Sequence, residues 1–224
     1  DNWNYQMKLK KFKYPDYVNF NNKIGSLLIE WSKTKKDFRV GGPKRHRFFD
    51  PECTWHSVDN LFDFKEFLPL CDFILDNVPD GLEFETMWAI LAKTGSKGLR
   101  HSHTGNLSYC YYISNGHNDD EEVTGKVSIE TSNGNEVVEP QDGLLLTFSA
   151  RAHHTIHEYL GDKTRIVISG DLKPTSEKHM HLGFYKKRSK AMGVVHGHPI
   201  YMTAFAASGE DLPDKILPEL VALI

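Results

Sequence analysis

Long apolar runs and an excess of positive charge are both absent from this chain of 224 residues. A membrane-spanning helix needs about 20 consecutive, predominantly apolar residues, so we expect no membrane partner. Lysines and arginines number 27 against 30 aspartates and glutamates, which gives a formal net charge of −3. Because binding to long nucleic acid needs a basic surface that neutralises phosphates, we expect no nucleic-acid partner either.

Cysteine is scarce. The three residues, Cys53, Cys71 and Cys110, show no C-x-x-C or zinc-finger spacing. An odd number without such spacing argues against a disulfide framework and favours a reducing compartment. The N-terminal stretch is polar and aromatic and has no apolar segment of the kind that a signal peptide carries. These features together predict a cytoplasmic protein.

The composition is that of a folded protein, because 39% of the residues are hydrophobic and 25% are charged. The length predicts one domain over residues 1–224. Within it we expect N-terminal helical support over 1–82, a β-rich core over 83–172 and an extension over 173–224. The extension closes with an expected helix over 212–224, which packs within the chain or forms a homodimer contact.

Two segments of the first third show helical spacing of apolar residues, 17–33 and 61–77, and Pro69 marks a start or a break in the second. After residue 82 the pattern changes to short β-branched and aromatic runs separated by Gly, Asn, Asp and Ser. These runs cover 82–95, 106–114, 125–132, 143–150 and 164–172. Asn133-Gly134 is a two-residue hairpin turn. Such spacing predicts an all-β sandwich or barrel.

Histidine is abundant, with 12 residues, most of them in clusters. His101 and His103 are separated by one residue, so in an extended chain both imidazoles point to the same side and can face one metal ion. A later cluster contains His154, and Arg165 opens the strand that follows. Three ligands on one face of a metal leave three positions for a bidentate 2-oxo acid and dioxygen. The planar fork of an arginine suits the far carboxylate of such an acid.

With these motifs the chain resembles the Fe(II)- and 2-oxoglutarate-dependent dioxygenases, most closely their bacterial and phage subgroup with an H-x-H motif. The resemblance runs over about residues 88–172 and includes three motifs: W-x-x-x-x-K-x-G from Trp88, H-x-H followed by S-x-x-Y-Y, and D-G-L-L-L-T-F-S-A-R-A-H-H over 142–154. It implies a mainly β (α+β) fold with a double-stranded β-helix (jelly-roll, cupin-like) core, N-terminal helices and a C-terminal helical extension. It also implies Fe(II), 2-oxoglutarate and O2, and hydroxylation of a small-molecule or peptidyl substrate.

The resemblance implies that His101, His103 and His154 bind the metal. It further implies that Arg165 grips 2-oxoglutarate, with Tyr112 or Ser169 as a second contact. The candidate substrate contacts are Arg45, Arg47, Asn106 and His157.

Two positions depart from the family pattern. Position 103 is usually Asp or Glu, so His103 either binds the metal or lies behind the ligands. The position two residues after Arg165 is often serine but here is Val167.

Three other functions remain open on the sequence alone. A cupin-type three-histidine iron dioxygenase would bind its substrate directly, without 2-oxoglutarate. A zinc hydrolase would use the same histidines with an open position for water, and Glu158 is the nearest carboxylate for a general base. A non-catalytic jelly-roll binding module would hold no metal.

Overall fold

The computed structural model describes residues 8–35, 53–118, 121–175 and 187. The chain divides into two packing units, Asp1–Thr175 and Ser176–Ile224, and apart from Lys187 every described residue belongs to the first. The expected helix over 212–224 and the candidate contacts Arg45 and Arg47 lie outside the described residues. No helix in the described part of the chain is long and apolar enough to cross a membrane.

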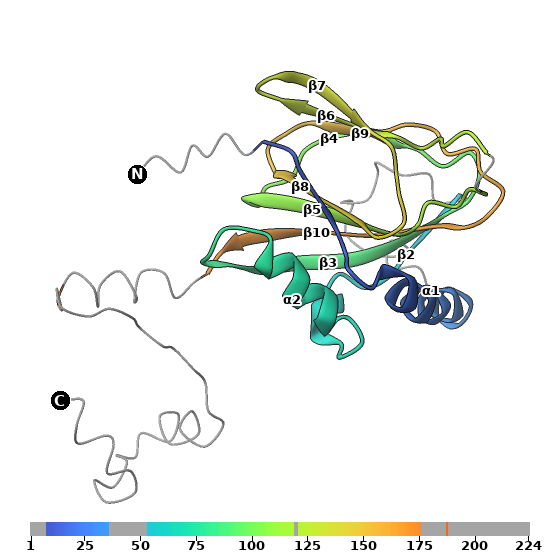
Figure 1. Cartoon of the computed structure of the whole chain (residues 1–224), viewed down its shortest axis with the longest axis horizontal. Helices are drawn as coiled ribbons and strands as arrows, with labels where there is room; N and C mark the ends of the chain where they lie inside the picture. Colours follow the sequence, from blue (N-terminus) through green and yellow to red (C-terminus); the bar gives the residue numbers. More distant parts are fainter. Residues whose placement is uncertain (1–7, 36–52, 119–120, 176–186, 188–224) are drawn as a thin grey trace, which may run out of the picture. The chain divides into compact units, whose positions relative to one another are not determined.

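Ten strands in the described ranges form two antiparallel sheets (Figure 1). The large sheet has the order β1 (Lys10–Lys13), β8 (Leu144–Ser149), β5 (Leu107–Ser114), β10 (Arg165–Pro174), β3 (Leu82–Ala92) and β2 (Thr54–His56). The small sheet has the order β4 (Gly98–His101), β9 (His154–Ile156), β6 (Val127–Thr131) and β7 (Gly134–Val138). The prediction of a mainly β protein is therefore confirmed.

Two helices, α1 (Tyr17–Thr34) and α2 (Leu68–Asp76), cover the outer face of the large sheet (Figure 1). The helix expected over 17–33 is confirmed. The second is shorter than expected, because a 3-10 turn, η2 (Leu61–Asp63), precedes it. Pro69 lies in the first turn of α2, where its missing N–H breaks no hydrogen bond. Ile24 of α1 and Ile74 of α2 share one buried cluster with residues of β3, β5 and β10.

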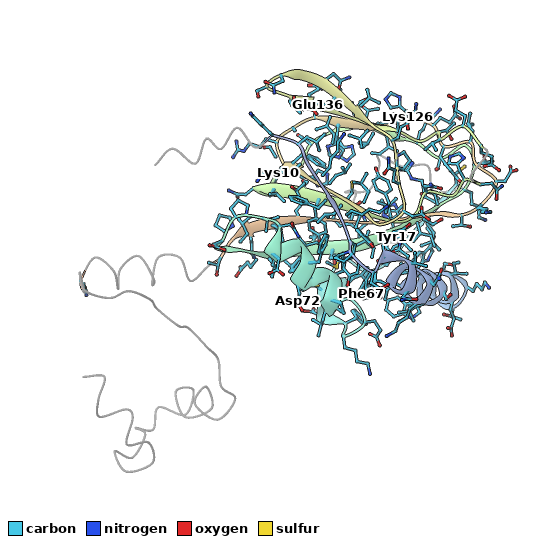
Figure 2. All side chains as sticks on the ribbon, viewed as in Figure 1. Lys10, Tyr17, Phe67, Asp72, Lys126 and Glu136 are labelled. Atoms are coloured by element: carbon cyan, nitrogen blue, oxygen red, sulfur yellow. The ribbon has the colours of Figure 1, made fainter. Side chains whose placement is uncertain are left out.

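Side chains alternate between the two faces of the large sheet, as strand geometry requires. Tyr109 and Tyr111 of β5 pack in the cluster under the helices. Tyr112 instead joins a second buried cluster with Val127 and Ile129 of the small sheet. Figure 2 shows side chains filling the space between the sheets, with Lys126 on the small-sheet side and Phe67 on the helical side. The inner face of the large sheet therefore packs against the small sheet.

Four short strands escaped the sequence analysis: β1, β2, β4 and β9. Each has only three or four residues, too few to show an alternating pattern, and pairing with a neighbouring strand defines them. The β6–β7 hairpin is confirmed with its turn one residue earlier than expected. Thr131 pairs with Gly134, so Ser132 and Asn133 form the loop. Gly134 has a φ of +111°, which favours glycine at this position.

Candidate metal centre and its cavity

Three histidines predicted from the sequence lie together beside β4 and β9, the first two strands in the order of the small sheet. His101 ends β4 and pairs directly with His154, the first residue of β9. His103 follows in the next loop, where its N–H donates to the carbonyl of Ala150 at 2.7 Å. Each imidazole offers one nitrogen, and the three nitrogens lie within 4.8 Å of one another. The three nitrogens are close enough together to make this group a candidate for binding one ion.

Hydrogen bonds at Nδ1 fix the tautomer of each ring. His101 Nδ1 lies 2.7 Å from the Leu99 carbonyl, and His154 Nδ1 lies 3.2 Å from the Ala152 carbonyl. His103 Nδ1 lies 2.8 Å from Oδ2 of Asp171. Carbonyl and carboxylate oxygens only accept hydrogen bonds, so each Nδ1 carries a proton and donates it. In the neutral rings Nε2 is therefore the nitrogen that carries the lone pair, which is the atom an imidazole uses to bind a metal ion.

The surroundings keep two of these rings neutral. Burial, followed by the neighbouring His101, lowers the pKa of His154 to about 3. Burial also lowers the pKa of His101, although its hydrogen bond to the Leu99 carbonyl opposes this. A neutral imidazole is the form that binds metal, so both rings are prepared for ligation at neutral pH.

Arg165, the first residue of β10, is a buried cation in the same region, with only 4% of its surface exposed. Its Nη1 donates to the Gly125 carbonyl at 2.7 Å, whereas its buried Nε has no hydrogen-bond partner among the described residues. The guanidinium lies over the ring of Tyr112, 5.4 Å from the centroid, and 6.0 Å from that of Tyr159. No described Asp or Glu forms an ion pair with it. A buried, uncompensated cation is costly, so this arrangement favours an anionic ligand.

One cavity, partly open to solvent, is lined by the three histidines and by Arg165. Tyr112 and Ser169, the expected second contacts of the co-substrate, also line it. Its walls include the aromatic rings of Trp88 and Phe148. The indole N–H of Trp88 is buried without a hydrogen-bond partner. The cavity thus combines a metal-binding end, a buried cation and mostly apolar walls, as small-molecule sites do.

Two candidate substrate contacts lie away from the cavity-lining residues. Asn106 is exposed, and its backbone bonds to Leu172 and Ala150. His157 is exposed, with Nε2 2.5 Å from Oγ of Ser128.

Two further residues of the His154 region are also not among the residues that line the cavity. His153 is half exposed and lies 4.0 Å from Oε2 of Glu130. Glu158, the carboxylate considered for a hydrolase, is exposed and does not line the cavity.

Sequence reasoning missed the residues that support the site. Asp171 holds His103, and the available signal was its position on the same face of the strand as Arg165. Gly125 has a φ of +68°, and a Cβ atom there would lie 2.3 Å from Nη1 of Arg165. Tyr159 is fully buried and places its hydroxyl 2.7 Å from the Gly116 carbonyl. No spacing rule in the sequence points to Gly125 or Tyr159.

Comparison of sequences points to an aldolase family. Residues 85–224 match the model of the Class II Aldolase and Adducin N-terminal domain. An L-fuculose phosphate aldolase of Methanococcus maripaludis is 38% identical over 88 residues, which are 39% of this chain and 44% of that protein. A 5-deoxy-D-ribulose 1-phosphate aldolase of Bacillus thuringiensis is 45% identical over 47 residues, 21% of this chain and 22% of that protein. The chain therefore spans less than half the length of these relatives.

Comparison of structures points to another group. A Pseudomonas putida prolyl-4-hydroxylase has a TM-score of 0.55 at 14% identity, covering 75% of this chain and 94% of that one. A Trichoplax adhaerens prolyl hydroxylase, in complex with a hypoxia inducible factor peptide, has a TM-score of 0.54 at 12% identity, covering 78% and 86%. HygX of Streptomyces hygroscopicus, with nickel and 2-oxoglutarate bound, has a TM-score of 0.52 at 12% identity, covering 76% and 84%. At these identities the likeness shows the fold.

The two comparisons differ in what they show. The fold similarity agrees with the motifs that resemble the iron dioxygenases, because the similar structures include two prolyl hydroxylases. The match to an aldolase family was not predicted from the sequence. That match begins within β3 and takes in all of Ser176–Ile224. Because it covers more than half of the residues, the chain belongs to the family of the Class II Aldolase and Adducin N-terminal domain.

Proposed function

We propose that the unit Asp1–Thr175 is a double-stranded β-helix oxygenase of the H-x-H subgroup. It binds Fe(II) and couples the oxidative decarboxylation of 2-oxoglutarate by O2 to hydroxylation of a small-molecule or peptidyl substrate. One observation carries this proposal: a single cavity is lined by three imidazoles whose ring nitrogens lie close together and by a buried arginine that forms no ion pair with any described Asp or Glu. A dicarboxylic 2-oxo acid satisfies both ends, because it chelates a metal through one end and offers a carboxylate at the other.

Each end of the co-substrate has assigned residues in this proposal. His101, His103 and His154 hold the metal through Nε2. Arg165 grips the distal carboxylate through its free Nε, and Tyr112 donates its hydroxyl to the same group. Burial raises the pKa of Tyr112 far above its ordinary value, so this hydroxyl stays protonated and able to donate. Fe(II), when bound, supplies the activation of dioxygen.

The walls of the cavity determine what else can enter. Phe148, Val167 and Trp88 present apolar surface between the two ends. Such surface excludes water, which strengthens the attraction between Arg165 and a carboxylate. Ser169 lies on the same inward face of β10 as Arg165 and adds a hydroxyl to the cavity.

The decisive experiment is an anaerobic titration of the Fe(II)-loaded protein with 2-oxoglutarate, followed by visible absorption. We expect a metal-to-ligand charge-transfer band that saturates in the wild type and is lost at the same concentrations in Arg165→Ala. Arg151→Ala is the matched control, because Arg151 is exposed and does not line the cavity. No band in the presence of stoichiometric iron would instead favour the three-histidine dioxygenase that binds its substrate directly. Failure to bind iron would favour zinc or a non-catalytic module.

The family match favours a second candidate, aldol cleavage of a sugar phosphate. The relatives named as aldolases match only 39% and 21% of the chain, so this activity is a separate proposal. Incubation with L-fuculose 1-phosphate, without oxygen or 2-oxoglutarate, tests it. Cleavage that persists in His154→Ala would assign the activity to residues outside the described cavity.

A further inference from the structure

Asp171 forms a contact that sets His103 apart from the other two histidines. Its Oδ2 accepts the proton of His103 Nδ1 at 2.8 Å, and its Oδ1 accepts from the Ser108 hydroxyl at 2.5 Å. Both carboxylate oxygens are thus engaged, and only 8% of the residue is exposed. Asp171 therefore supports His103 rather than joining the three donors that face the metal position.

The acceptors at Nδ1 of the other two rings are neutral. His101 and His154 donate to the backbone carbonyls of Leu99 and Ala152. A carboxylate behind an imidazole fixes its orientation and raises its basicity more than a carbonyl does. The negative charge near this site is therefore delivered through one particular ligand.

We propose that Asp171 is a positioning residue that acts through His103 and supplies the negative charge that a carboxylate ligand would otherwise bring to the metal. Non-haem iron sites commonly use two histidines and one carboxylate, which lowers the net charge around the ion. Here the third candidate ligand is the imidazole of His103. The carboxylate of Asp171 contacts the opposite nitrogen of that ring, Nδ1, instead of the metal position. The inference rests on the metal centre of the proposed function, not on its use of 2-oxoglutarate.

The surroundings hold Asp171 in place for this role. Its backbone N–H donates to the Thr86 hydroxyl at 3.2 Å on the neighbouring strand β3. The loop that carries His103 closes over it at Gly105, where a Cβ atom would lie 3.1 Å from the Asp171 Cβ. Trp88 stacks on the His103 ring, with centroids 6.1 Å apart and planes 16° from parallel. Asp171 thus contacts the edge of the His103 ring at Nδ1, and Trp88 contacts its face.

The test is a double-mutant cycle on Zn²⁺ affinity in the full chain, measured against a competing chelator. Asp171→Asn keeps the shape and an acceptor oxygen but removes the charge, and we expect it to weaken Zn²⁺ binding about 10- to 100-fold. In a His103→Ala background the same change should have no further effect, because Asp171 then has no ligand to act through. Glu121→Gln is the matched control, since Glu121 pairs with His117 in the same way, at 3.3 Å, away from the metal centre.

Spectra of the Co²⁺-loaded proteins give a second measurement. We expect Asp171→Asn to shift the visible absorption bands of Co²⁺, while Glu121→Gln leaves them unchanged and the metal-free variants unfold at similar temperatures. Equal Zn²⁺ affinity and equal Co²⁺ spectra in wild type and Asp171→Asn would overturn the inference and leave the proposed oxygenase intact. Additive losses in the cycle would also overturn it, since they assign Asp171 an effect independent of His103. A wild type that binds metal but shows no 2-oxoglutarate band would refute the proposed function alone.

Discussion

Gly125 is expected to be essential for holding Arg165 in the cavity, and replacing it by alanine tests this directly. The residue has a φ of +68°, and an added Cβ would lie 2.3 Å from Nη1 and 3.4 Å from Cζ of Arg165. Nη1 is the mobile end of its side chain, so the clash is relieved when it withdraws from the Gly125 carbonyl. The rings of Tyr112 and Tyr159 limit where the guanidinium can go.

The expected loss of stability in Gly125→Ala has two parts. The left-handed backbone costs an alanine about 1–2 kcal/mol. Loss of the hydrogen bond between the Arg165 cation and the Gly125 carbonyl costs about 1.5–3 kcal/mol more. Together they predict that Gly125→Ala lowers the free energy of unfolding by about 2.5–5 kcal/mol.

Gly81→Ala separates these parts. Gly81 has a similar φ of +78°, and a Cβ there would meet nothing within 4 Å. In urea denaturation of the metal-free protein, we expect Gly81→Ala to lose only the part of the stability that the left-handed backbone costs, about 1–2 kcal/mol. Gly125→Ala should also weaken 2-oxoglutarate binding, whereas Gly81→Ala should not. Equal losses of stability in the two variants, with equal co-substrate affinity, would refute the assignment of Gly125 as a support of Arg165.

Three further outcomes are expected. Tyr159→Phe should lower the free energy of unfolding by about 0.5–1.5 kcal/mol in urea, because the hydroxyl that bonds the carbonyls of Gly116 and Lys163 is removed; an unchanged midpoint would contradict this. Burial holds the pKa of His154 at about 3, below the ordinary 6.5, so as pH falls the unfolded chain binds this proton first. The stability of the metal-free protein should therefore be full above pH 6.5 and fall as pH drops toward 3, and the pH dependence of the urea midpoint should be weaker in His154→Gln. A chain that ends at Thr175 should keep its metal affinity in calorimetry, because the cavity and both buried clusters lie within Asp1–Thr175; loss of cooperative unfolding would show that the remaining residues are needed.

Long periodic segments were predictable from the sequence because their own pattern determines their structure. The helix over 17–33 buries one face, and its apolar residues recur at helical spacing. The strands around Tyr111 and Ile168 are buried on both faces, and their continuous runs of β-branched and aromatic residues indicate this. The short strands β4 and β9 were not predictable, since pairing between His101 and His154 defines them and such pairing is a tertiary property. The three histidines of the candidate metal centre were still found, because their side-chain chemistry is evident even where the secondary structure is not.

The residues around these ligands could not be found in the same way. Asp171, Gly125 and Tyr159 each matter through one contact made across the fold, at 68, 40 and 43 residues of separation. A single sequence contains no signal for contacts of this kind. The strand parity of β10 was the only available clue, and it pointed to Ser169 before Asp171.

The strand β10 explains why the two ends of the cavity keep a fixed separation. It lies in the large sheet between β5 and β3 and is paired along its length with both. Its inward face carries Arg165 at the start of the strand and Asp171 six residues later, about 20 Å along the strand at a rise of about 3.3 Å per residue. Because hydrogen bonds on both sides prevent this strand from sliding, the buried cation and the carboxylate that contacts His103 are parts of one rigid element.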